Sequence, residues 1–451
     1  MNSAERPGDQ GHCEVPPDFA DRRGVATGPI GWVWAVDVRL GGVAAKERMT
    51  TMGLRGDAAI VGFTERPSER RFGGTPRFTI EQWADLAAAA LADAGIAACE
   101  VDGIVCGGDV MEAEHFVPAT VAEYCGWHVN LAERVDLGGA GPVGGVWRAA
   151  AAIELGLCNV VVIAAPAHAS PQPPVPPPFD PRILYGASSN IYGSPQAEFE
   201  IPYGHLAQNG GFASYAMRYH ETYGWDERAR AKIVADQRVS AAVNPNAVWF
   251  GKPVTIDEVL ASPMISDPLH LLEIVMPCHG GAAIVVTSRE RARTVRHRAA
   301  FVTGFGEHIM HKTPTYTPDL TRTPIGPAAD RAFSMAGIGR SDVDMVQLYD
   351  CYSITALLSI EDSGFCGKGE GMQFVRDHDL SYRGDFPCNT HGGQLGCGQS
   401  RLAGGMSHVV EAVRQIQARA GDRQLAAHHT AYVSGTGGVM SEQAALILQG
   451  A

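Results

Sequence analysis

The feature that most constrains the fold of this chain is an alternation of short apolar strands and amphipathic helices. In the first half, the pattern predicts a strand at 58–63, a helix at 80–94 and a strand at 101–106. A strand–helix–strand unit follows over 134–164. Alternation of this kind indicates an α/β protein with mostly parallel strands.

The second half repeats this plan and indicates an internal duplication. Residues 90–105 and 332–347 both contain a helix that ends in Ala-Gly-Ile and is followed by an Asp and a strand. We therefore expect two halves of similar fold, at 55–292 and 293–451. The elements expected in the second half are strands at 300–305, 345–348, 430–434 and 444–448, and helices at 328–336, 353–363 and 406–418.

Two segments fall outside this plan. Residues 1–54 have scattered charge and no sustained periodicity, so we expect a disordered N-terminal extension. Residues 166–203 are rich in proline, which prevents regular backbone hydrogen bonding. Because this stretch also contains tyrosines, we expect a packed binding loop or lid. Helices at 206–223 and 226–242 and a strand at 282–287 complete the first half.

Composition limits the class of protein. The chain has 451 residues, 45% hydrophobic content and a formal net charge of -13, which describes a globular protein without a nucleic-acid-binding surface. Its ten cysteines include no C-x-x-C pair, so the sequence predicts neither a metal site nor a disulfide framework. Free thiols fit a reducing cytosol, and the apolar run 160–167 is too short to span a bilayer. We expect a cytoplasmic protein without a membrane span.

The segment 388–405 carries the most chemical information. It is rich in glycine, contains polar and thiol side chains, and leads into the helix expected at 406–418. Glycine lets a backbone turn tightly and approach a ligand closely. Amide groups at the start of a helix can hold a carbonyl or an oxyanion. The sequence therefore predicts a ligand-binding loop here.

Several motifs together resemble those of a known family. They are Tyr203-Gly204 ahead of a helix, 347–352, Asp362 to Cys366, Asn389 to Gly405, and Ser434-Gly435-Thr436-Gly437-Gly438. With them, residues 57–450 resemble the thiolase superfamily, and within it the sterol-carrier and lipid-transfer-protein branch. The resemblance implies a duplicated five-layer αβαβα thiolase fold and a homodimer. It also implies an active site where coenzyme A thioesters meet both halves.

The departures from the thiolase pattern concern the catalytic groups. Thiolases place a nucleophilic cysteine at the start of the helix that here follows 138–141, where this chain has Gly139 or Ala140. The His-Asp-Cys-Phe motif appears here as Tyr349-Asp350-Cys351-Tyr352, and the His-Pro pair as Gln399-Ser400. The C-terminal Cys-x-Gly-Gly-Gly appears as 434–438. The groups that perform covalent acyl transfer are therefore missing.

These departures resemble the thiolase-like aldolases that shorten steroid side chains. That resemblance implies retro-aldol cleavage of a β-hydroxyacyl-CoA without an acyl-enzyme. Such a reaction needs a base for the β-hydroxyl proton and donors that stabilise the thioester enolate. Tyr349 is the candidate for the first task, which requires neighbours that lower its pKa from ~10. Loop amides and Gln399 are candidates for the second.

The candidate catalytic residues are Tyr349, Gln399, His391 and Cys397. Each also has a structural alternative: a tyrosine bonded to backbone, a helix-start cap, a histidine in a tight turn, and an inert buried thiol. Coenzyme A is expected as part of the substrate, with no separately bound cofactor. The backbone amides expected to hold the thioester are those of Gly392, Gly393, Gly435, Gly437 and Gly438.

Two alternative functions remain open at this point. The first is an acetyl-CoA acyltransferase that uses Cys397 as its nucleophile. The second is a non-catalytic subunit of thiolase-like fold that binds acyl-CoA or lipid. The resemblance further implies a small acyl-CoA-binding partner of the zinc-ribbon/OB-fold type, which would be a separate polypeptide.

Overall fold

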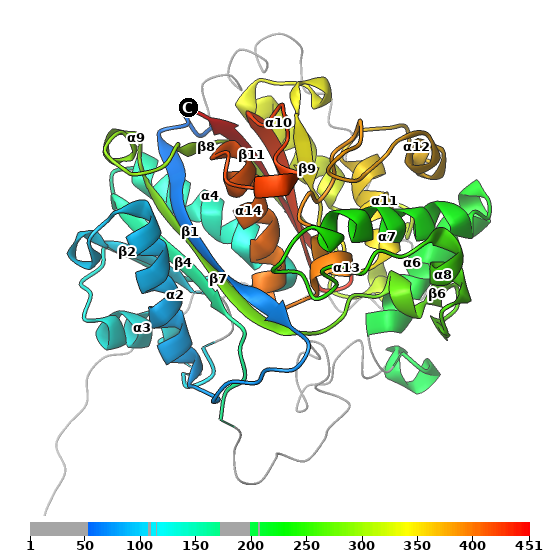
Figure 1. Ribbon diagram of the computed structural model, residues 1–451, viewed down its shortest axis with the longest axis horizontal. Coiled ribbons are helices and arrows are strands. Elements are labelled where there is room, and N and C mark those ends of the chain that lie inside the picture. The colour runs from blue at the N-terminus through cyan, green and yellow to red at the C-terminus, as the bar shows by residue number, and fades with distance from the viewer. Residues whose placement is uncertain (1–52, 107–109, 114, 172–198, 206–207) are drawn as a thin grey trace, which may run out of the picture. The chain divides into compact units, whose positions relative to one another are not determined.

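The computed structural model describes residues 53–106, 110–113, 115–171, 199–205 and 208–451. All of these residues belong to one compact unit. Of the two irregular segments expected from the sequence, residues 1–52 of the N-terminal extension and 172–198 of the proline-rich loop lie outside the described residues. A nine-stranded sheet runs through the unit in the order β3-β2-β4-β7-β1-β8-β11-β10-β9 (Figure 1).

The first half of the chain supplies five strands of this sheet. Helices α2, α3 and α4 connect its strands along the chain, and α4 follows a glycine-rich turn at 138–140. The elements are β1 (Ala58–Glu69), α2 (Thr79–Ala94), β2 (Gly103–Cys106), α3 (Val117–Cys125), β3 (Leu131–Arg134), α4 (Gly141–Glu154), β4 (Val160–Pro166) and β7 (His279–Ser288).

The second half supplies the other four strands. The short helix α9 (Arg289–Ala292) leads into it. Its elements are β8 (Ala300–Ile309), α10 (Ile325–Ala336), β9 (Met345–Gln347), α11 (Ser353–Asp362), α12 (Gly371–Asp377), α13 (Gly393–Cys397), α14 (Leu402–Ile416), β10 (Thr430–Gly437) and β11 (Glu442–Gly450).

Corresponding strands of the two halves pair in the same relative directions, as expected of a duplicated fold. In the first half β1 and β4 are both antiparallel to β7, and β4 is parallel to β2. In the second half β8 and β10 are both antiparallel to β11, and β10 is parallel to β9. The halves meet where β1 pairs with β8 through Ala59 and Ile60.

The expectation of mostly parallel strands is wrong. Only β2–β3, β2–β4 and β9–β10 are parallel within the large sheet, and the remaining five pairs are antiparallel. A crossover helix gives parallel neighbours, whereas a strand that returns directly pairs antiparallel. The strand β11 follows β10 after a short turn, so it returns antiparallel, and β7 has the equivalent place in the first half.

Three apolar cores lie between the layers of the fold, which is a stack of helices, half-sheet, helices, half-sheet and helices. A central core takes side chains from α4, from α14 and from the facing sides of both half-sheets. The strand β4 shows the alternation: Val161 and Ile163 face the central core, and Val160 and Val162 face the outer core under α2 and α3. On the other side, α10 and α11 cover the second half-sheet. Helices α4 and α14 therefore lie between the two half-sheets (Figure 1).

The central helices are buried because protein surrounds them. Every residue of α14 from Ala403 to Ile416 is buried, which is expected of a helix that is packed on all faces. Helix α4 begins at Gly141, because the 138–140 glycine turn leads directly into it. The glycine-rich stretch 138–141 therefore forms the start of α4.

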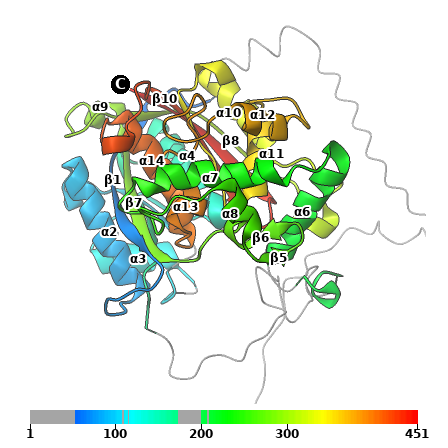
Figure 2. The same cartoon turned by 45° about the vertical axis from the view of Figure 1, so that its right-hand side comes forward.

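An insertion between β4 and β7 forms a helical cover. It contains α6 (Gln208–Tyr223), α7 (Glu227–Ala242), α8 (Ile256–Ala261) and the small hairpin of β5 (Met264–Ser266) and β6 (Leu269–His270). Helix α7 packs against α11, α12 and α13, and Figure 2 shows it lying across α13. Among the described residues, no helix is both long and apolar enough to span a bilayer.

Candidate active site

The structure brings two of the predicted catalytic residues together. Tyr349 lies just after β9, and Gln399 lies between α13 and α14. The Nε2 of Gln399 donates a hydrogen bond of 2.8 Å to the Tyr349 hydroxyl. The backbone N–H of Tyr349 donates to the Ser434 hydroxyl on β10, 3.3 Å away. The parallel pairing of β9 with β10 therefore positions the tyrosine, and the loop before α14 supplies the amide.

The phenol of Tyr349 fills space that a side chain at position 139 would need. Gly139 lies in the turn that starts α4, and a Cβ added to it would overlap the Tyr349 hydroxyl and the Thr436 carbonyl oxygen. Of the two residues considered for the position of the thiolase nucleophile, Gly139 is therefore the one that faces the phenol. The Cα of Ala140 instead lies close to Gly435.

A cavity of about 180 Å³ opens beside Tyr349. Its walls combine the start of α4, the end of β10 and the loop before α14. Of the five glycines expected to hold the thioester, Gly438 lines this cavity. The lining residues are Gly138, Gly139, Gln208, Tyr349, Cys351, Gln399, Arg401, Leu402, Thr436 and Gly438.

A larger cavity of about 870 Å³ shares Gln208, Gln399 and Arg401 with the smaller one. Its wall is mostly apolar and includes Trp249, residues 271–272 and 274–277, and Leu395. A pocket of this size, apolar with a few polar groups, is typical of small-molecule sites. Gln399 therefore lines both cavities.

The larger cavity also carries positive charge. Arg70, Arg238 and Arg401 all line it. The Arg238 guanidinium lies 4.0 Å from the centre of the Trp249 ring, and its Nε donates to the Lys252 carbonyl at 3.0 Å. Burial lowers the pKa of Arg238 to about 10, so this side chain stays a cation at neutral pH. A cation held against an aromatic wall can receive an anionic ligand group.

Burial determines the protonation state of Tyr349. The side chain is 4% exposed, and burial raises its pKa well above the ordinary value, while the Gln399 amide acts in the opposite direction. The condition set for a tyrosine base, that neighbours lower its pKa, is therefore not met. A charged phenolate is costly in a site with little solvent. Tyr349 is a neutral phenol at neutral pH.

Asp350 and Asn389 hold the backbone around the site. Asp350 is fully buried and accepts hydrogen bonds from the backbone N–H groups of Gln394 at 2.7 Å and Leu395 at 3.3 Å. Burial raises the Asp350 pKa to about 7. The Asn389 carboxamide bonds both backbone groups of Leu348, at 2.7 and 2.8 Å. Both side chains therefore orient their neighbours, and neither lines the cavities.

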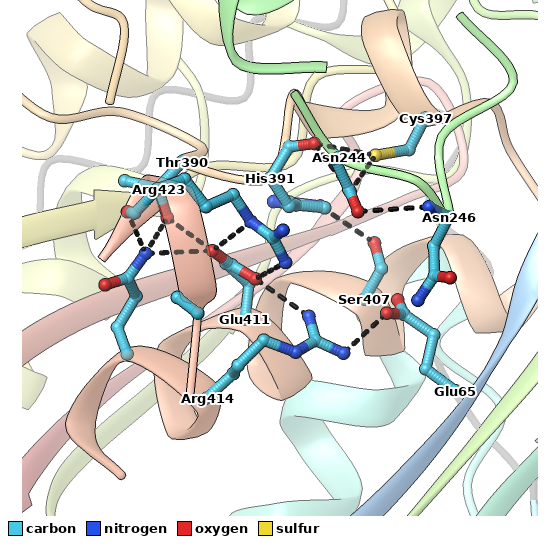
Figure 3. A network of polar contacts seen from close by, with 12 residues as sticks. Glu65, Asn244, Asn246, Thr390, His391, Cys397, Ser407, Glu411, Arg414 and Arg423 are labelled. Carbon is cyan, nitrogen blue, oxygen red and sulfur yellow. Dashed lines mark hydrogen bonds and ion pairs between the residues drawn. The ribbon is translucent and has the colours of Figure 1, made fainter. Parts of the chain in front are cut away.

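Cys397 and His391 lie in a different buried network (Figure 3). The Cys397 thiol donates to the His391 carbonyl at 3.0 Å, and the Nδ2 of Asn244 donates to the same carbonyl at 2.9 Å. The His391 Nε2 lies 3.3 Å from the Ser407 hydroxyl. Cys397 lines a water-sized space of about 10 Å³, and neither residue lines the two cavities beside Tyr349.

The electrostatics of this network oppose a reactive thiol. Burial raises the pKa of the Cys397 thiol well above its usual range. Burial also lowers the pKa of His391 to about 4, so its imidazole is neutral near pH 7. A nucleophilic cysteine needs a thiolate, usually beside a cation. The geometry does not provide this pairing, because the thiol contacts the backbone carbonyl of His391 and the ring faces Ser407.

A buried ion network fixes the same region of the chain. Glu411 on α14 accepts hydrogen bonds from Arg414 at 2.8 Å and from Arg423 at 3.1 Å. Both arginines lower the pKa of Glu411, and Arg414 also pairs with Glu65 on β1 at 2.7 Å. Figure 3 shows how this network joins β1, α14 and the loop after it.

Four of the five predicted glycines have a packing reason for their identity. A Cβ at Gly392 would lie 2.6 Å from the Ala241 side chain, and one at Gly393 would overlap the Asp350 carboxylate. A Cβ at Gly435 would lie 2.9 Å from the Ala140 Cα, and one at Gly437 would overlap the Leu137 carbonyl. None of the four lines the two cavities.

Sequence reasoning missed Thr436, Gln208 and Arg401 as wall residues. Thr436 lies inside a motif that was recognised, so its position was a usable signal. Arg401 has φ 48 and ψ -131, a backbone conformation that a non-glycine residue rarely adopts and that is often found at functional sites. Nothing in the sequence around Arg401 indicates this conformation. Among the described residues, no group of three or more His, Cys, Asp or Glu side chains could hold a metal ion.

Comparison with known proteins agrees with this geometry. A family model described as thiolase C-terminal domain-like matches residues 306–450. The chain is 31% identical over 380 residues to a steroid side-chain-cleaving aldolase of Thermomonospora curvata, covering 81% of this chain and 91% of the relative. It is 30% identical over 402 residues to the 17-hydroxy-3-oxo-4-pregnene-20-carboxyl-CoA lyase of Mycobacterium tuberculosis, covering 85% and 97%.

Solved structures show the same likeness. One described as Ltp2-ChsH2(DUF35) aldolase superimposes with a TM-score of 0.77 and 29% identity, covering 88% of this chain and 99% of that one. The duplicated five-layer fold, with its cavity at the start of a central helix, defines a protein of the thiolase-fold class. The similarity extends over both halves of the chain. The chain belongs to the thiolase superfamily, in the sterol-carrier and lipid-transfer-protein branch that contains these aldolases.

Proposed function

We propose that the protein is a carbon–carbon lyase that cleaves a β-hydroxyacyl-CoA by a retro-aldol reaction, without a covalent acyl-enzyme. The relatives described above are named as an aldolase and a lyase, and one of those names specifies a carboxyl-CoA compound with a hydroxyl group. The names therefore support a coenzyme A thioester as substrate and carbon–carbon cleavage as the reaction.

The single observation that carries the proposal is the position of the Tyr349 hydroxyl. It fills the space beside Gly139, at the start of α4. The resemblance assigns the thiolase nucleophile to this position. A phenol in this place can exchange protons with a substrate, but it lacks the sulfur that would become acylated. Proton transfer is what a retro-aldol reaction requires.

A neutral phenol suits the proton balance of this reaction. The bond between the α- and β-carbons breaks, the β-hydroxyl oxygen becomes a carbonyl oxygen, and the electron pair forms the thioester enolate. The hydroxyl proton is lost from oxygen and one proton is added at the α-carbon, so no redox partner is needed. Tyr349 would donate its own proton to the α-carbon and receive the hydroxyl proton, which leaves the phenol unchanged after each turnover.

The cavity walls supply groups for the enolate oxygen. The turn of Gly138 and Gly139 presents backbone amides at the start of the 14-residue helix α4. The positive end of a helix stabilises negative charge. We propose that these amides, with that of Gly438, stabilise the enolate, because donors aimed at developing charge contribute strongly to catalysis. Gln399 would hold the phenol oxygen in place.

The larger cavity would hold the remainder of the substrate. Its apolar wall suits a bulky acyl group, of the steroid or lipid side-chain type that the relatives' names indicate. Arg70 and Arg238 would face the anionic groups of coenzyme A. The acyltransferase alternative gains no support from the geometry, since Cys397 lies outside both cavities.

We also propose that the protein works as a cytoplasmic homodimer with a small acyl-CoA-binding partner of the zinc-ribbon/OB-fold type. The support for the partner is the name of the related solved structure, which joins two components. The division into halves at 55–292 and 293–451 is part of the same proposal, and the matched strand pairing supports it.

The direct experiment uses a synthetic β-hydroxyacyl-CoA with a bulky β-substituent. We expect the purified protein to release a carbonyl product and a shortened acyl-CoA in equal amounts, measured by chromatography and mass spectrometry. Tyr349→Phe should lower kcat by about 100-fold or more, because it removes the transferred proton. Equal turnover by Tyr349→Phe, or thiolysis of a β-ketoacyl-CoA through a trapped acyl-enzyme, would contradict the proposal.

A further inference from the structure

A cluster of buried polar side chains lies behind Tyr349, on the protein side of the cavity. Gln394 on α13 and His408 on α14 are both fully buried. The Nε2 of Gln394 lies 3.3 Å from the Nε2 of His408, and the His408 ring centre lies 6.0 Å from that of Tyr349. Asp350 completes the cluster, with its Oδ1 at 3.5 Å from the same histidine nitrogen.

The hydrogen bonds of this cluster centre on Gln394, which contacts both His408 and Asp350. Asp350 accepts the backbone N–H of Gln394 at 2.7 Å, so it fixes the position of that residue's backbone. The Gln394 carboxamide also acts on the Tyr349 hydroxyl, because it opposes the rise in the pKa of the phenol that burial causes. A carboxamide has two N–H donors, so Gln394 can contact the histidine and the phenol at the same time.

Packing alone does not explain these polar side chains. The Nδ1 of His408 and the Oε1 of Gln394 have no hydrogen-bond partner within the part of the chain that the structure describes. Buried polar atoms without partners are unfavourable and need an explanation. Glu411 on the same helix is also buried and polar, but its carboxylate has partners in Arg414 and Arg423.

The packing around Gly404 is a second observation that concerns the two glutamine side chains. Gly404 lies one turn before His408 on α14, and a Cβ added to it would lie 3.1 Å from the Oε1 of Gln394 and 3.1 Å from the Cγ of Gln399. The missing side chain at 404 leaves room for both glutamines. The side chains of Gln394 and Gln399, the second of which bonds the Tyr349 hydroxyl, are therefore packed against the same point of α14.

We propose that His408 and Gln394 are positioning residues for Tyr349. His408 orients the Gln394 carboxamide, and Gln394 together with Gln399 holds the phenol oxygen as a hydrogen-bond acceptor. The hydrogen of the phenol is then directed into the cavity, toward the reacting carbon. The kinetic part of this inference rests on the proposed lyase activity, whereas the orientation of the phenol does not depend on any substrate.

The first test therefore uses no substrate. Nuclear magnetic resonance of protein with isotope-labelled tyrosine rings reports the hydrogen bonding of each phenol, and the Tyr349 signal is the one lost in Tyr349→Phe. We expect His408→Phe to shift this signal. Ser407→Ala is the matched control, because Ser407 is a buried polar residue on the same helix whose hydroxyl contacts Gly404 and His391 and not the Tyr349 cluster.

The second test is kinetic. His408→Phe should lower kcat on the order of 100-fold with KM changed by less than about 3-fold, because a displaced reacting group slows the chemical step. His408→Gln should recover part of the loss, since its carboxamide reaches the same place. In a Tyr349→Phe background, His408→Phe should have no further effect, because it acts through the phenol.

The outcomes separate the possible explanations. If His408→Phe does not fold, Gln394→Met tests the same idea without a change in α14. An unchanged Tyr349 signal in folded His408→Phe or Gln394→Met, or an equal shift in Ser407→Ala, would overturn the positioning role. A wild-type protein that turns over no β-hydroxyacyl-CoA would instead count against the proposed function, and the resonance test would still decide the orientation of the phenol.

Discussion

The Tyr349 hydroxyl and Gly139 share one small volume, in which either a phenol or a side chain at position 139 fits. A Cβ on Gly139 would overlap the hydroxyl, so the two residues depend on each other although they are far apart in sequence. A thiol could not simply be restored at this position while the tyrosine stays. This relationship leads to the first prediction.

We predict that Gly139→Ala displaces the phenol and lowers kcat on the order of 100-fold. The matched control is Gly141→Ala, also at the start of α4, where an added Cβ would come no closer than 3.8 Å to Val135. This control should keep kcat within about 3-fold of the wild type, since it creates no overlap. Steady-state kinetics of both variants checks the prediction, and equal losses in the two would contradict it.

The buried carboxyl of Asp350 should make stability depend on pH. Its pKa is raised to about 7 by burial, above the value of about 3.9 expected in the unfolded chain. Between these values the folded state binds more protons than the unfolded state, so the contribution of Asp350 to stability falls as pH rises. The expected slope is on the order of 1 kcal/mol per pH unit.

The comparison with Asp350→Asn isolates this effect, because the variant cannot ionise there. Urea denaturation of both proteins at pH 5 and pH 7.5 should show the wild type losing stability relative to the variant as the pH rises. A free-energy difference between the two that stays constant over this range would mean that Asp350 is ionised throughout.

Cys397 should be unreactive in the folded protein. Its thiol is buried, its pKa is raised, and it lies outside the Tyr349 cavities, so native alkylation should not reach it. Iodoacetamide should instead label the exposed Cys99, which is the internal positive control. Mass spectrometry of the labelled protein, with activity measured in parallel, checks both sites. Rapid labelling of Cys397 together with loss of activity would revive the acyltransferase alternative.

Glu411 should contribute strongly to stability. It is fully buried and pairs with Arg414 and Arg423, so Glu411→Gln removes the carboxylate that two buried cations share, although Arg414 keeps its second partner Glu65. We expect a loss of about 3 to 5 kcal/mol in the free energy of unfolding, measured by denaturant titration. Asp257→Asn is the control, because the Arg228–Asp257 pair is 62% and 80% exposed and should change stability by less than about 0.5 kcal/mol. Similar losses in both variants would be inconsistent with the network shown in Figure 3.

The amino-acid sequence by itself determined the order of the elements, the duplication and the family. These properties depend on local patterns, such as apolar periodicity in α2 and the motif that contains Tyr349, and local patterns are present in the chain before it folds. The sequence also showed that no cysteine stands at the start of α4. It could not predict the antiparallel return of β7 and β11, because strand pairing depends on the connections in space.

Only the tertiary structure decided which candidate residues meet. Cys397 and Gln399 are close together in the chain, yet the loop between them directs the thiol into a buried network and the carboxamide onto Tyr349. The protonation of Tyr349 and Asp350 was equally beyond the sequence, since burial changes a pKa and burial is a property of the packed molecule. The overlap between Gly139 and Tyr349 exists only because the start of α4 and the end of β9 are brought together in space, and that three-dimensional contact places a phenol at the start of a central helix.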